Sequence, residues 1–407
     1  MNKNPCASEP AGRPAHSAWP THPTHPTHPS HQPYQPHQAH QPHQPYLHRF
    51  AQFVAGCTVL LILAGSLVTS HDAGLSVPDW PTSYGWNMFT FPPSMWVANI
   101  FYEHGHRLVA SSVGFLTIVL AVWLWLDEPR RWLRWLGAVA LGAVVAQGVL
   151  GGLTVLFFLP APISIGHAAL AEIFFCLTVA IALFTSPGWT NGGLWMADCG
   201  IQQLRHQIRN PPSAIRDGTL RRIATATTAL IYLQILIGAA MRHTGAGLAI
   251  PDFPLMFGRI VPDHWSGAIA VHFAHRIGAA IVGVFAGATI AAVWSARERR
   301  RDLTRPAAVL AGLVLVQLTL GALTILTRRD PLINSFHVVC GALVLATSLV
   351  IALRTWRSIF ESVRLKPDST AVVVNTPIHE PCVGSVRFQP DVPVVGVRLQ
   401  PDDKSCA

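Results

Sequence analysis

Eight long apolar segments follow one another along the chain, separated by shorter stretches in which polar residues, proline and glycine collect. About 20 consecutive apolar residues are enough to cross the hydrocarbon core of a bilayer as an α-helix. The segments therefore predict eight transmembrane helices, at residues 49–70, 97–125, 133–157, 163–186, 221–241, 267–294, 305–327 and 332–354.

The fold class follows from the medium in which these segments must lie. Lipid offers backbone groups no hydrogen bonds, so only helices and closed barrels span a bilayer. Strands of membrane barrels alternate apolar and polar residues, whereas these segments are apolar throughout. Half of the residues are hydrophobic and only 12% are charged. We predict an all-α integral membrane protein.

The second half of the chain repeats the first at an offset of about 170 residues, as many membrane proteins with internal repeats do. Ala73–Pro81 returns as Ala246–Pro254, and Gln147–Thr154 returns as Gln317–Thr324. Each half holds four of the predicted helices. We therefore expect the eight transmembrane helices to form two pseudo-symmetric four-helix bundles.

The segments that flank and join the two halves differ from them in composition. The N-terminal segment consists largely of Thr-His-Pro and His-Gln-Pro units, with little apolar surface to bury. The expected organisation is a disordered His/Pro/Gln-rich tail at 1–48, an N-terminal four-helix half at 49–186, a cytoplasmic linker at 187–219, a C-terminal four-helix half at 220–356 and a disordered C-terminal tail at 357–407.

The net charge of +9 reflects topology more than a nucleic-acid partner. Arginines collect between predicted helices 2 and 3, 4 and 5, and 6 and 7, and again after helix 8, whereas the opposite loops hold few. Cytoplasmic loops of membrane proteins are enriched in basic residues. We expect a multi-pass protein of the cell (plasma or inner) membrane with both termini cytoplasmic, and no binding of nucleic acid.

Two pairs of histidines occupy matching positions in the repeat. His106 and His167 belong to the second and fourth predicted helices, and His275 and His337 to the sixth and eighth, with nearly the same spacing. The topology puts all four near the outer ends of their helices, where each pair can converge. An ionisable side chain inside a membrane helix is costly unless it is paired or coordinated.

Two imidazoles that face each other across a helical bundle suit the axial positions of a heme iron. A bare zinc or copper site would usually add cysteine, methionine, aspartate or a third histidine. The chain has no CxxC and no CxxCH motif, which excludes covalent c-type attachment and a cysteine-rich zinc site. We predict two hemes, with His106, His167, His275 and His337 as the metal ligands.

Charged neighbours of these ligands are further candidates. Arg107 and Arg276 follow the ligands directly and can contact heme propionates; the alternative is an arginine that extends to interfacial water. Glu103 precedes His106 by three residues and shares its helix face, whereas the second half has His272 there. A carboxylate beside a heme can transfer protons or stabilise a developing cation. The alternative is a surface carboxylate paired with Arg107 or an outer loop.

In these motifs the chain resembles the heme A synthase family, whose members have eight membrane helices in two four-helix repeats. The resemblance covers about residues 49–356. It rests on Glu103–Arg107, on His275 with Arg276, on His167 and His337, and on the outer loop that ends in Asp79-Trp80-Pro81. The chain lacks the cysteine pair that some members carry in the first outer loop, which indicates the subgroup without it.

The resemblance implies that the protein converts heme O to heme A for a terminal oxidase, by successive hydroxylations of the C8 methyl group and loss of water to a formyl group. By position, His106 and His167 would hold the substrate heme O, with Glu103 as the catalytic carboxylate. His275 and His337 would hold heme b as an electron-transfer cofactor. Expected partners are membrane lipid, a heme O synthase and an electron donor, and an oligomer is compatible with the pattern.

Two other functions would use the same histidines. A diheme b-type membrane protein could pass electrons without transforming a substrate, although Glu103, present in one half only, would then have no role. A heme carrier or transporter is also compatible with a two-fold repeat, but two bis-histidine sites would hold their hemes against release.

Overall fold

The computed structural model describes residues 44–190 and 211–364; the predicted tails lie almost wholly outside this range, as does much of the predicted linker. The described chain is mostly helical, apart from two long connections at 71–98 and 244–266. Its long helices are α1 (Pro45–Ser70), α2 (Asn99–Asp127), α3 (Arg131–Leu156), α4 (Ala161–Phe184), α7 (Pro211–His243), α8 (Gly267–Ser295), α9 (Arg301–Leu326) and α10 (Pro331–Arg364). Short helices are η1 (Met88–Thr90), η2 (Pro93–Met95), α5 (Pro187–Thr190) and η3 (Ala246–Leu248).

All eight predicted membrane helices are present, and each is long and apolar enough to span a bilayer. Several continue beyond their predicted ends. Helix α1 begins at Pro45, and proline suits the first turn of a helix. This turn packs against the protein, since Leu47 is only 1% exposed. Helix α7 begins at Pro211, and α10 continues to Arg364. Hydropathy locates the part of a helix inside lipid but not the turns that extend into water.

Side chains just before two helices satisfy backbone groups that the first turn leaves without partners. The hydroxyl of Ser266 accepts a hydrogen bond from the Ile269 N–H at the start of α8, at 3.3 Å. The carboxylate of Asp330 accepts from the N–H groups of Leu332 and Ile333 at the start of α10, at 3.0 and 3.1 Å.

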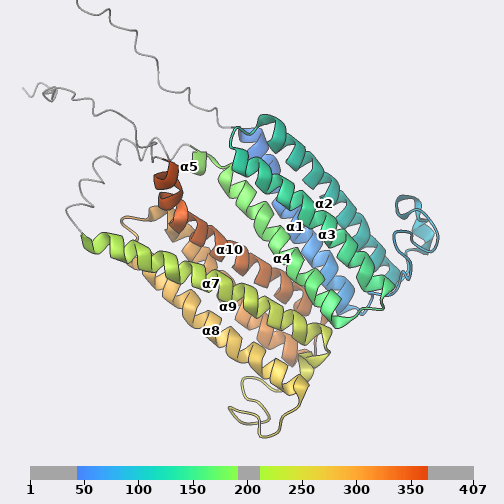
Figure 1. The fold of residues 1–407 in the computed structure, drawn as a ribbon. Coiled ribbons are helices and arrows are strands. Elements are labelled where there is room, and N and C mark those ends of the chain that lie inside the picture. Colours follow the sequence, from blue (N-terminus) through green and yellow to red (C-terminus); the bar gives the residue numbers. More distant parts are fainter. Residues whose placement is uncertain (1–43, 191–210, 365–407) are drawn as a thin grey trace, which may run out of the picture.

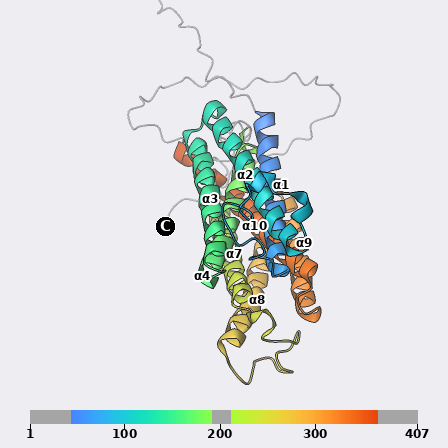
Figure 2. The same cartoon turned by 90° about the vertical axis from the view of Figure 1, so that its right-hand side faces the viewer.

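Helices α1–α4 lie together, and α7–α10 lie together beside them (Figure 1). Within each group, the first helix contacts the second and the fourth, and the third contacts the fourth. Between the groups, α10 contacts α1 and α4, and α4 contacts α7. The helices remain roughly aligned when the molecule is turned by 90° (Figure 2). A two-fold relation between the groups stays a prediction.

Each group packs around its own apolar cluster. Leu120 and Phe174 belong to the cluster of the first group, and Leu310 and Leu345 to that of the second. A smaller cluster around Phe175 joins α4 to α10 between the groups. The clusters also reach across the boundary, since Leu353 of α10 packs on the first and Cys176 of α4 on the second.

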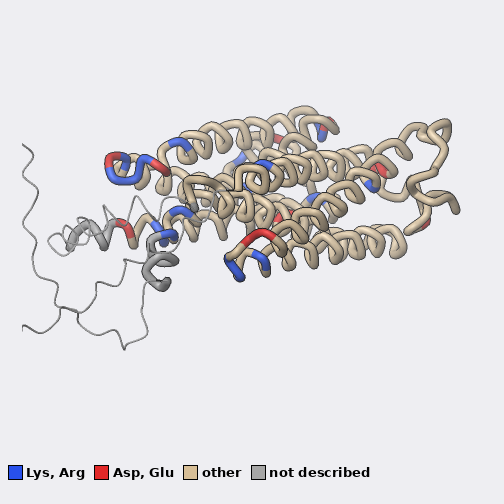
Figure 3. The backbone as a smooth tube through the Cα atoms, turned by 90° about the horizontal axis from the view of Figure 1, so that it is seen from above, with Lys and Arg blue, Asp and Glu red and all other residues tan. Residues whose placement is uncertain are grey.

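Basic residues gather at the end of the helices where the α2–α3 and α8–α9 connections lie (Figure 3). The α1–α2 and α7–α8 connections lie at the opposite end, together with the start of α4 and of α10 (Figure 1). The four predicted ligands therefore share the end that holds fewer arginines. That this end faces the outer side of the membrane stays a prediction from the distribution of basic residues.

The orientation predicts the outcome of reporter fusions. Alkaline phosphatase folds actively only outside the cytoplasm, so it should be active when fused within residues 88–98 and inactive when fused within 191–210. A fluorescent protein that matures only in the cytoplasm should give the reverse pattern. Phosphatase activity from the 191–210 fusion would show that both termini face outward.

Candidate functional site

The four predicted ligands come together as two close pairs. His106 on α2 and His167 on α4 lie near enough for charges on their rings to interact. The same is true of His275 on α8 and His337 on α10. Helices that are not adjacent in the chain thus bring together the pairs that the repeat predicted.

Each of these rings packs against a glycine of the helix that precedes it in the chain. A Cβ atom at the glycine would come within about 3 Å of the ring's Cε1, so no larger residue fits without movement. The distances are 2.9 Å from Gly65 to His106, 3.1 Å from Gly151 to His167, 3.0 Å from Gly238 to His275 and 3.0 Å from Gly321 to His337. The same local packing positions all four rings.

Three of the four rings also have a glutamine amide beside them. The Nε2 atom of the glutamine lies 3.0 to 3.4 Å from a ring nitrogen, in the pairs Gln147 with His167, Gln234 with His275, and Gln317 with His337. Gln147 and Gln317 were visible in the repeat, but their role was not predicted. Gln234 was missed altogether, because the corresponding residue of the first half is Leu61.

The site residues fit a heme held by two axial histidines. Buried Nδ1 atoms of His106, His167 and His337 have no hydrogen-bond partner in the described part of the chain. A neutral imidazole can coordinate iron through one nitrogen while the other donates its proton to a second group. The glutamine oxygens, which are buried and have no partner among the described residues, can accept that proton beside three of the rings if the amides turn them toward the ring. Within residues 44–190 and 211–364, no three histidine, cysteine or carboxylate side chains converge as a bare metal site would require.

Glu103 and Arg107 bind the first outer loop to the end of α2. The carboxylate of Glu103 accepts from the Val77 N–H through Oε2 and from Arg107 through Oε1, both at 2.8 Å. Arg107 also donates to the carbonyl oxygens of Val77, Asp79 and Thr82, at 2.7 to 3.0 Å. Glu103 is only 3% exposed. The loop therefore covers this carboxylate.

The second half repeats this arrangement with a different side chain in the place of the carboxylate. Arg276 donates to the carbonyl oxygens of Ile250, Asp252 and Leu255, at 2.7 to 3.1 Å. His272 lies 3.3 Å from the Ile250 nitrogen and 3.2 Å from Arg276 Nε. Glu103 and His272, the residues that differ between the halves, thus make equivalent contacts between a helix and its outer loop.

The exchange of carboxylate for imidazole changes what this position can do. The carboxylate of Glu103 accepts two hydrogen bonds at once and offsets the charge of Arg107. A neutral imidazole has a single acceptor nitrogen, so His272 accepts from Ile250 or from Arg276 but not from both. Only the first half has a buried anion here that can take up a proton.

Each outer loop turns around an aspartate. Asp252 accepts from the N–H groups of Phe257 and Gly258, at 2.8 and 2.9 Å. Asp79 accepts from the N–H groups of Tyr84 and Gly85 in the same way. The Gly258 N–H, followed by the Phe257 N–H, lowers the pKa of Asp252, so the carboxylate is charged at neutral pH.

The two arginines predicted as propionate contacts have other partners in the structure. Arg107 and Arg276 direct their donors to loop carbonyls, as described above, and so they order the outer loops. They lie near the ligands, as the sequence indicated. A propionate contact would be additional to these hydrogen bonds, and it stays a prediction.

The remaining outer histidines serve the loops or face solvent. His104 is fully buried and lies 3.1 Å from the Ser83 hydroxyl, so it is a packed loop anchor rather than a ligand. His264 is exposed and pairs with Asp263. His71 is partly exposed and stacks on Tyr102 at 3.9 Å between ring centroids.

Sequence reasoning also missed Glu172, a carboxyl group in the middle of α4. It is 4% exposed, and its Oε2 atom has no hydrogen-bond partner among the described residues. Cys176 and Tyr232 lie near enough to interact with it electrostatically. A lone glutamate in an apolar segment was the available signal, since such residues in membranes are functional candidates.

Residues 48–349 match the family model COX15-CtaA, described as a cytochrome oxidase assembly protein. A protein named heme A synthase from Symbiobacterium thermophilum is 30% identical over 285 residues, which are 69% of this chain and 85% of the relative. Proteins of the same name from Halalkalibacterium halodurans and Caulobacter sp. are 26% and 28% identical. These matches cover 72% and 75% of this chain and 92% and 94% of the relatives.

The family match spans both helical groups and all four histidines of the paired sites. The eight apolar helices have the membrane-spanning character that the sequence predicted. The chain belongs to the COX15-CtaA family of cytochrome oxidase assembly proteins.

Proposed function

We propose that the protein is a heme A synthase, which oxidises the C8 methyl group of heme O to a formyl group. The observation that carries the proposal is the pair of matched histidine sites, in which each ring packs on a glycine and only one site adjoins a buried carboxylate. The relatives that bear the name heme A synthase favour this function over a protein that only carries electrons or heme.

In this proposal one site binds the substrate and the other binds the electron-transfer cofactor. His106 and His167 hold the substrate heme O in the N-terminal half, at 49–186. His275 and His337 hold heme b in the C-terminal half, at 220–356. When bound, heme b supplies one-electron transfer, and the chemistry belongs largely to the cofactor and the substrate. The protein's part is to orient the rings, exclude water and move protons.

Glu103 is the catalytic carboxylate in this proposal. It lies three residues before His106, on the same face of α2, and it is sealed from solvent by the loop that it anchors. Each hydroxylation replaces a C–H bond of the methyl group with a C–O bond. With O2 as the oxygen source this consumes two electrons and two protons, and with water it releases two electrons and two protons, so a nearby group that moves protons is needed in either case. Glu103 can take up a proton at Oε2 if the Val77 N–H releases that atom, while Arg107 continues to hold Oε1.

The membrane location suits the substrate. Heme O carries a farnesyl chain, which is soluble in lipid, and a helical bundle whose sides face the bilayer admits it laterally. The protein contacts membrane lipid in any case, since its large outward-facing side chains, such as Phe115 and Val284, are apolar. A heme O synthase and an electron donor are the partners that this function needs.

The proposal predicts the hemes that can be extracted from membranes in which the chain is co-produced with a source of heme O. Acid-acetone extraction and chromatography should show heme A, together with a hydroxylated intermediate. Unchanged heme O beside a folded, heme b-loaded protein with a supply of reductant would contradict the synthase and favour electron transfer or heme carriage.

The same assay tests the role of Glu103. Glu103→Gln keeps an acceptor for the Val77 N–H but cannot take up a proton, so heme A should fall by about 100-fold, as is typical for loss of a general base. Heme b content should not change. The matched control is His272→Gln, which alters the equivalent loop contact of the second half. Wild-type heme A from Glu103→Gln would contradict the catalytic assignment.

The division between the halves predicts which variants lose heme b. His275→Ala or His337→Ala should remove the heme b spectrum of the purified protein, because a single axial imidazole remains. His106→Ala and His167→Ala should keep that spectrum and lose bound heme O. Full heme b content in both His275→Ala and His337→Ala would overturn this assignment, and a circular-dichroism spectrum would confirm that each variant is folded.

A further inference from the structure

The helix that packs against the first ligand of each pair differs between the halves along one face. In α7 the face carries Gln234, Gly238 and Arg242, and in α1 the residues at the equivalent repeat positions are Leu61, Gly65 and Thr69. Members of each set are four residues apart, so they form one stripe on their helix. The glycine is common to both, because it is the residue that lies against the histidine ring.

Arg242 is a half-buried cation that forms no ion pair in the described part of the chain, although Asp72 lies near enough to act on it electrostatically. Its Nη2 donates to the Ser66 carbonyl at 2.6 Å and to the Ser70 hydroxyl at 2.8 Å, both across the boundary on α1. Its Nε is buried and has no hydrogen-bond partner among the described residues, where Arg242 also makes no ion pair. Burying a charge is costly unless an opposite charge and hydrogen bonds accompany it.

The position of Arg242 indicates which anion its guanidinium can pair with directly. It lies one turn outward from Gly238, the residue against the His275 ring. It also lies near enough to His337 to interact with it electrostatically. Arg242 therefore borders the site between the two second-half ligands at its outer side, and a guanidinium is well suited to a carboxylate.

We propose that the α7 face retains the heme of the second half and that the α1 face allows the heme of the first half to leave. In α7, Arg242 binds a propionate and Gln234 holds the ring of His275, at 3.0 Å from Nδ1. In α1, Thr69 donates to the Gly65 carbonyl instead, at 3.3 Å, and Leu61 offers no hydrogen bond. This inference rests on the proposed function, in which one heme is a resident cofactor and the other is exchanged.

The test measures heme b itself and does not depend on heme A formation. Purified protein is loaded with heme b, and the rate of heme transfer to excess apomyoglobin and the midpoint potential are recorded. Arg242→Gln should release heme b about tenfold faster, as loss of a propionate ion pair worth about 1.4 kcal/mol would allow. Loss of the cation should also lower the midpoint potential, because a nearby positive charge favours the reduced heme. Arg242→Lys should be intermediate, because it keeps the charge but not the planar fork.

Two further variants make the result specific. Arg328→Gln removes an exposed charge from the same end of the second half and should change neither quantity. Thr69→Arg adds the cation to the first half and should slow release of heme O from it. Wild-type release and potential in Arg242→Gln would overturn the inference. A wild-type protein that binds no heme b would overturn the proposed function, and the inference with it.

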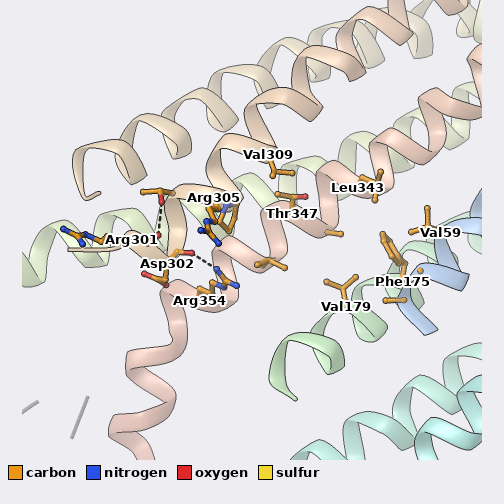
Figure 4. Close-up of a pocket in the computed structure, with 16 residues that line it drawn as sticks. Val59, Phe175, Val179, Arg301, Asp302, Arg305, Val309, Leu343, Thr347 and Arg354 are labelled. Atoms are coloured by element: carbon orange, nitrogen blue, oxygen red, sulfur yellow. Dashed lines mark hydrogen bonds between the residues drawn. The ribbon is translucent and has the colours of Figure 1, made fainter. Parts of the chain in front are cut away.

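A second, independent feature is a groove at the opposite end of the helices. It has a volume of about 1010 Å³ and runs between α1 and α4 on one side and α9 and α10 on the other (Figure 4). Arg354 on its rim and His337 are separated by almost five turns of α10, or about 25 Å at the α-helical rise. The groove is therefore separate from the histidine sites.

The groove is basic at its mouth and apolar along its length. Arg301, Arg305 and Arg354 lie at the mouth, whereas Phe175 and Leu343 line the part toward the membrane interior (Figure 4). Neither Arg301 nor Arg305 makes an ion pair in the described part of the chain. This arrangement matches the headgroup and the acyl chain of an anionic phospholipid.

The neighbouring charges leave the mouth of the groove positive. The carboxylate of Asp302 is engaged by Arg300 at 3.1 Å. Arg354 donates to the backbone carbonyl of Asp302 and not to its carboxylate. The charge of Asp302 still acts on Arg354, but three arginines and one carboxylate line the groove, so its mouth keeps a net positive charge. Basic pockets between membrane helices on the cytoplasmic side are suited to anionic headgroups.

We infer that an anionic phospholipid occupies this groove and joins the two helical groups along their cytoplasmic side. Its phosphate would lie at Arg301 and Arg305, and one acyl chain would follow the apolar wall toward Phe175. The small cluster around Phe175 is the apolar contact between the groups, so a lipid here would extend it.

Native mass spectrometry and thermal unfolding in detergent test this inference. Added phosphatidylglycerol should bind and raise the unfolding temperature, whereas phosphatidylcholine should not. Arg301→Gln with Arg305→Gln should weaken binding by about fivefold for each arginine removed. The control, Arg297→Gln with Arg299→Gln, removes two charges from the same connection away from the groove. Equal effects of the two lipids, or equal loss in the control, would overturn the inference.

Discussion

The close approach of a glycine to each histidine ring is the constraint on which the paired sites depend. The four glycines leave room for a ring where any side chain would collide with it, and they do so from the helix before each ligand helix. Helix packing thereby sets where the rings lie, and the buried ring nitrogens then require a partner. An iron between two such rings satisfies that requirement in an environment without water.

The outer loops are held over the sites by an equivalent contact in each half. A guanidinium at the end of α2 or α8 collects the carbonyl oxygens of the loop above it, so Arg107 and Arg276 each hold a loop against a helix end. The halves share this construction and differ in a few side chains, of which Glu103, Thr69 and Arg242 are the ones that change the local charge or its partners. Related scaffolds can thus serve a substrate and a cofactor.

Much of the architecture was predictable from the sequence because lipid imposes a simple rule on length and hydropathy. The eight helices and the pairing of His106 with His167 followed from apolar runs and from the internal repeat. The extensions of α7 and α10 did not, since hydropathy carries no information on helical turns in water. The roles of Gln234 and Arg242 were missed because the first half has Leu61 and Thr69 at the corresponding positions. A comparison of matching residues in the two halves does not identify a residue that occurs in one half only.

The most direct test of the account is an experimental structure of the protein purified with heme b and heme O. The account predicts one heme in each helical group, with the irons between His106 and His167 and between His275 and His337. It also predicts heme b in the second group, with a propionate at Arg242. A single heme between the groups, or iron bound by residues other than these histidines, would contradict it.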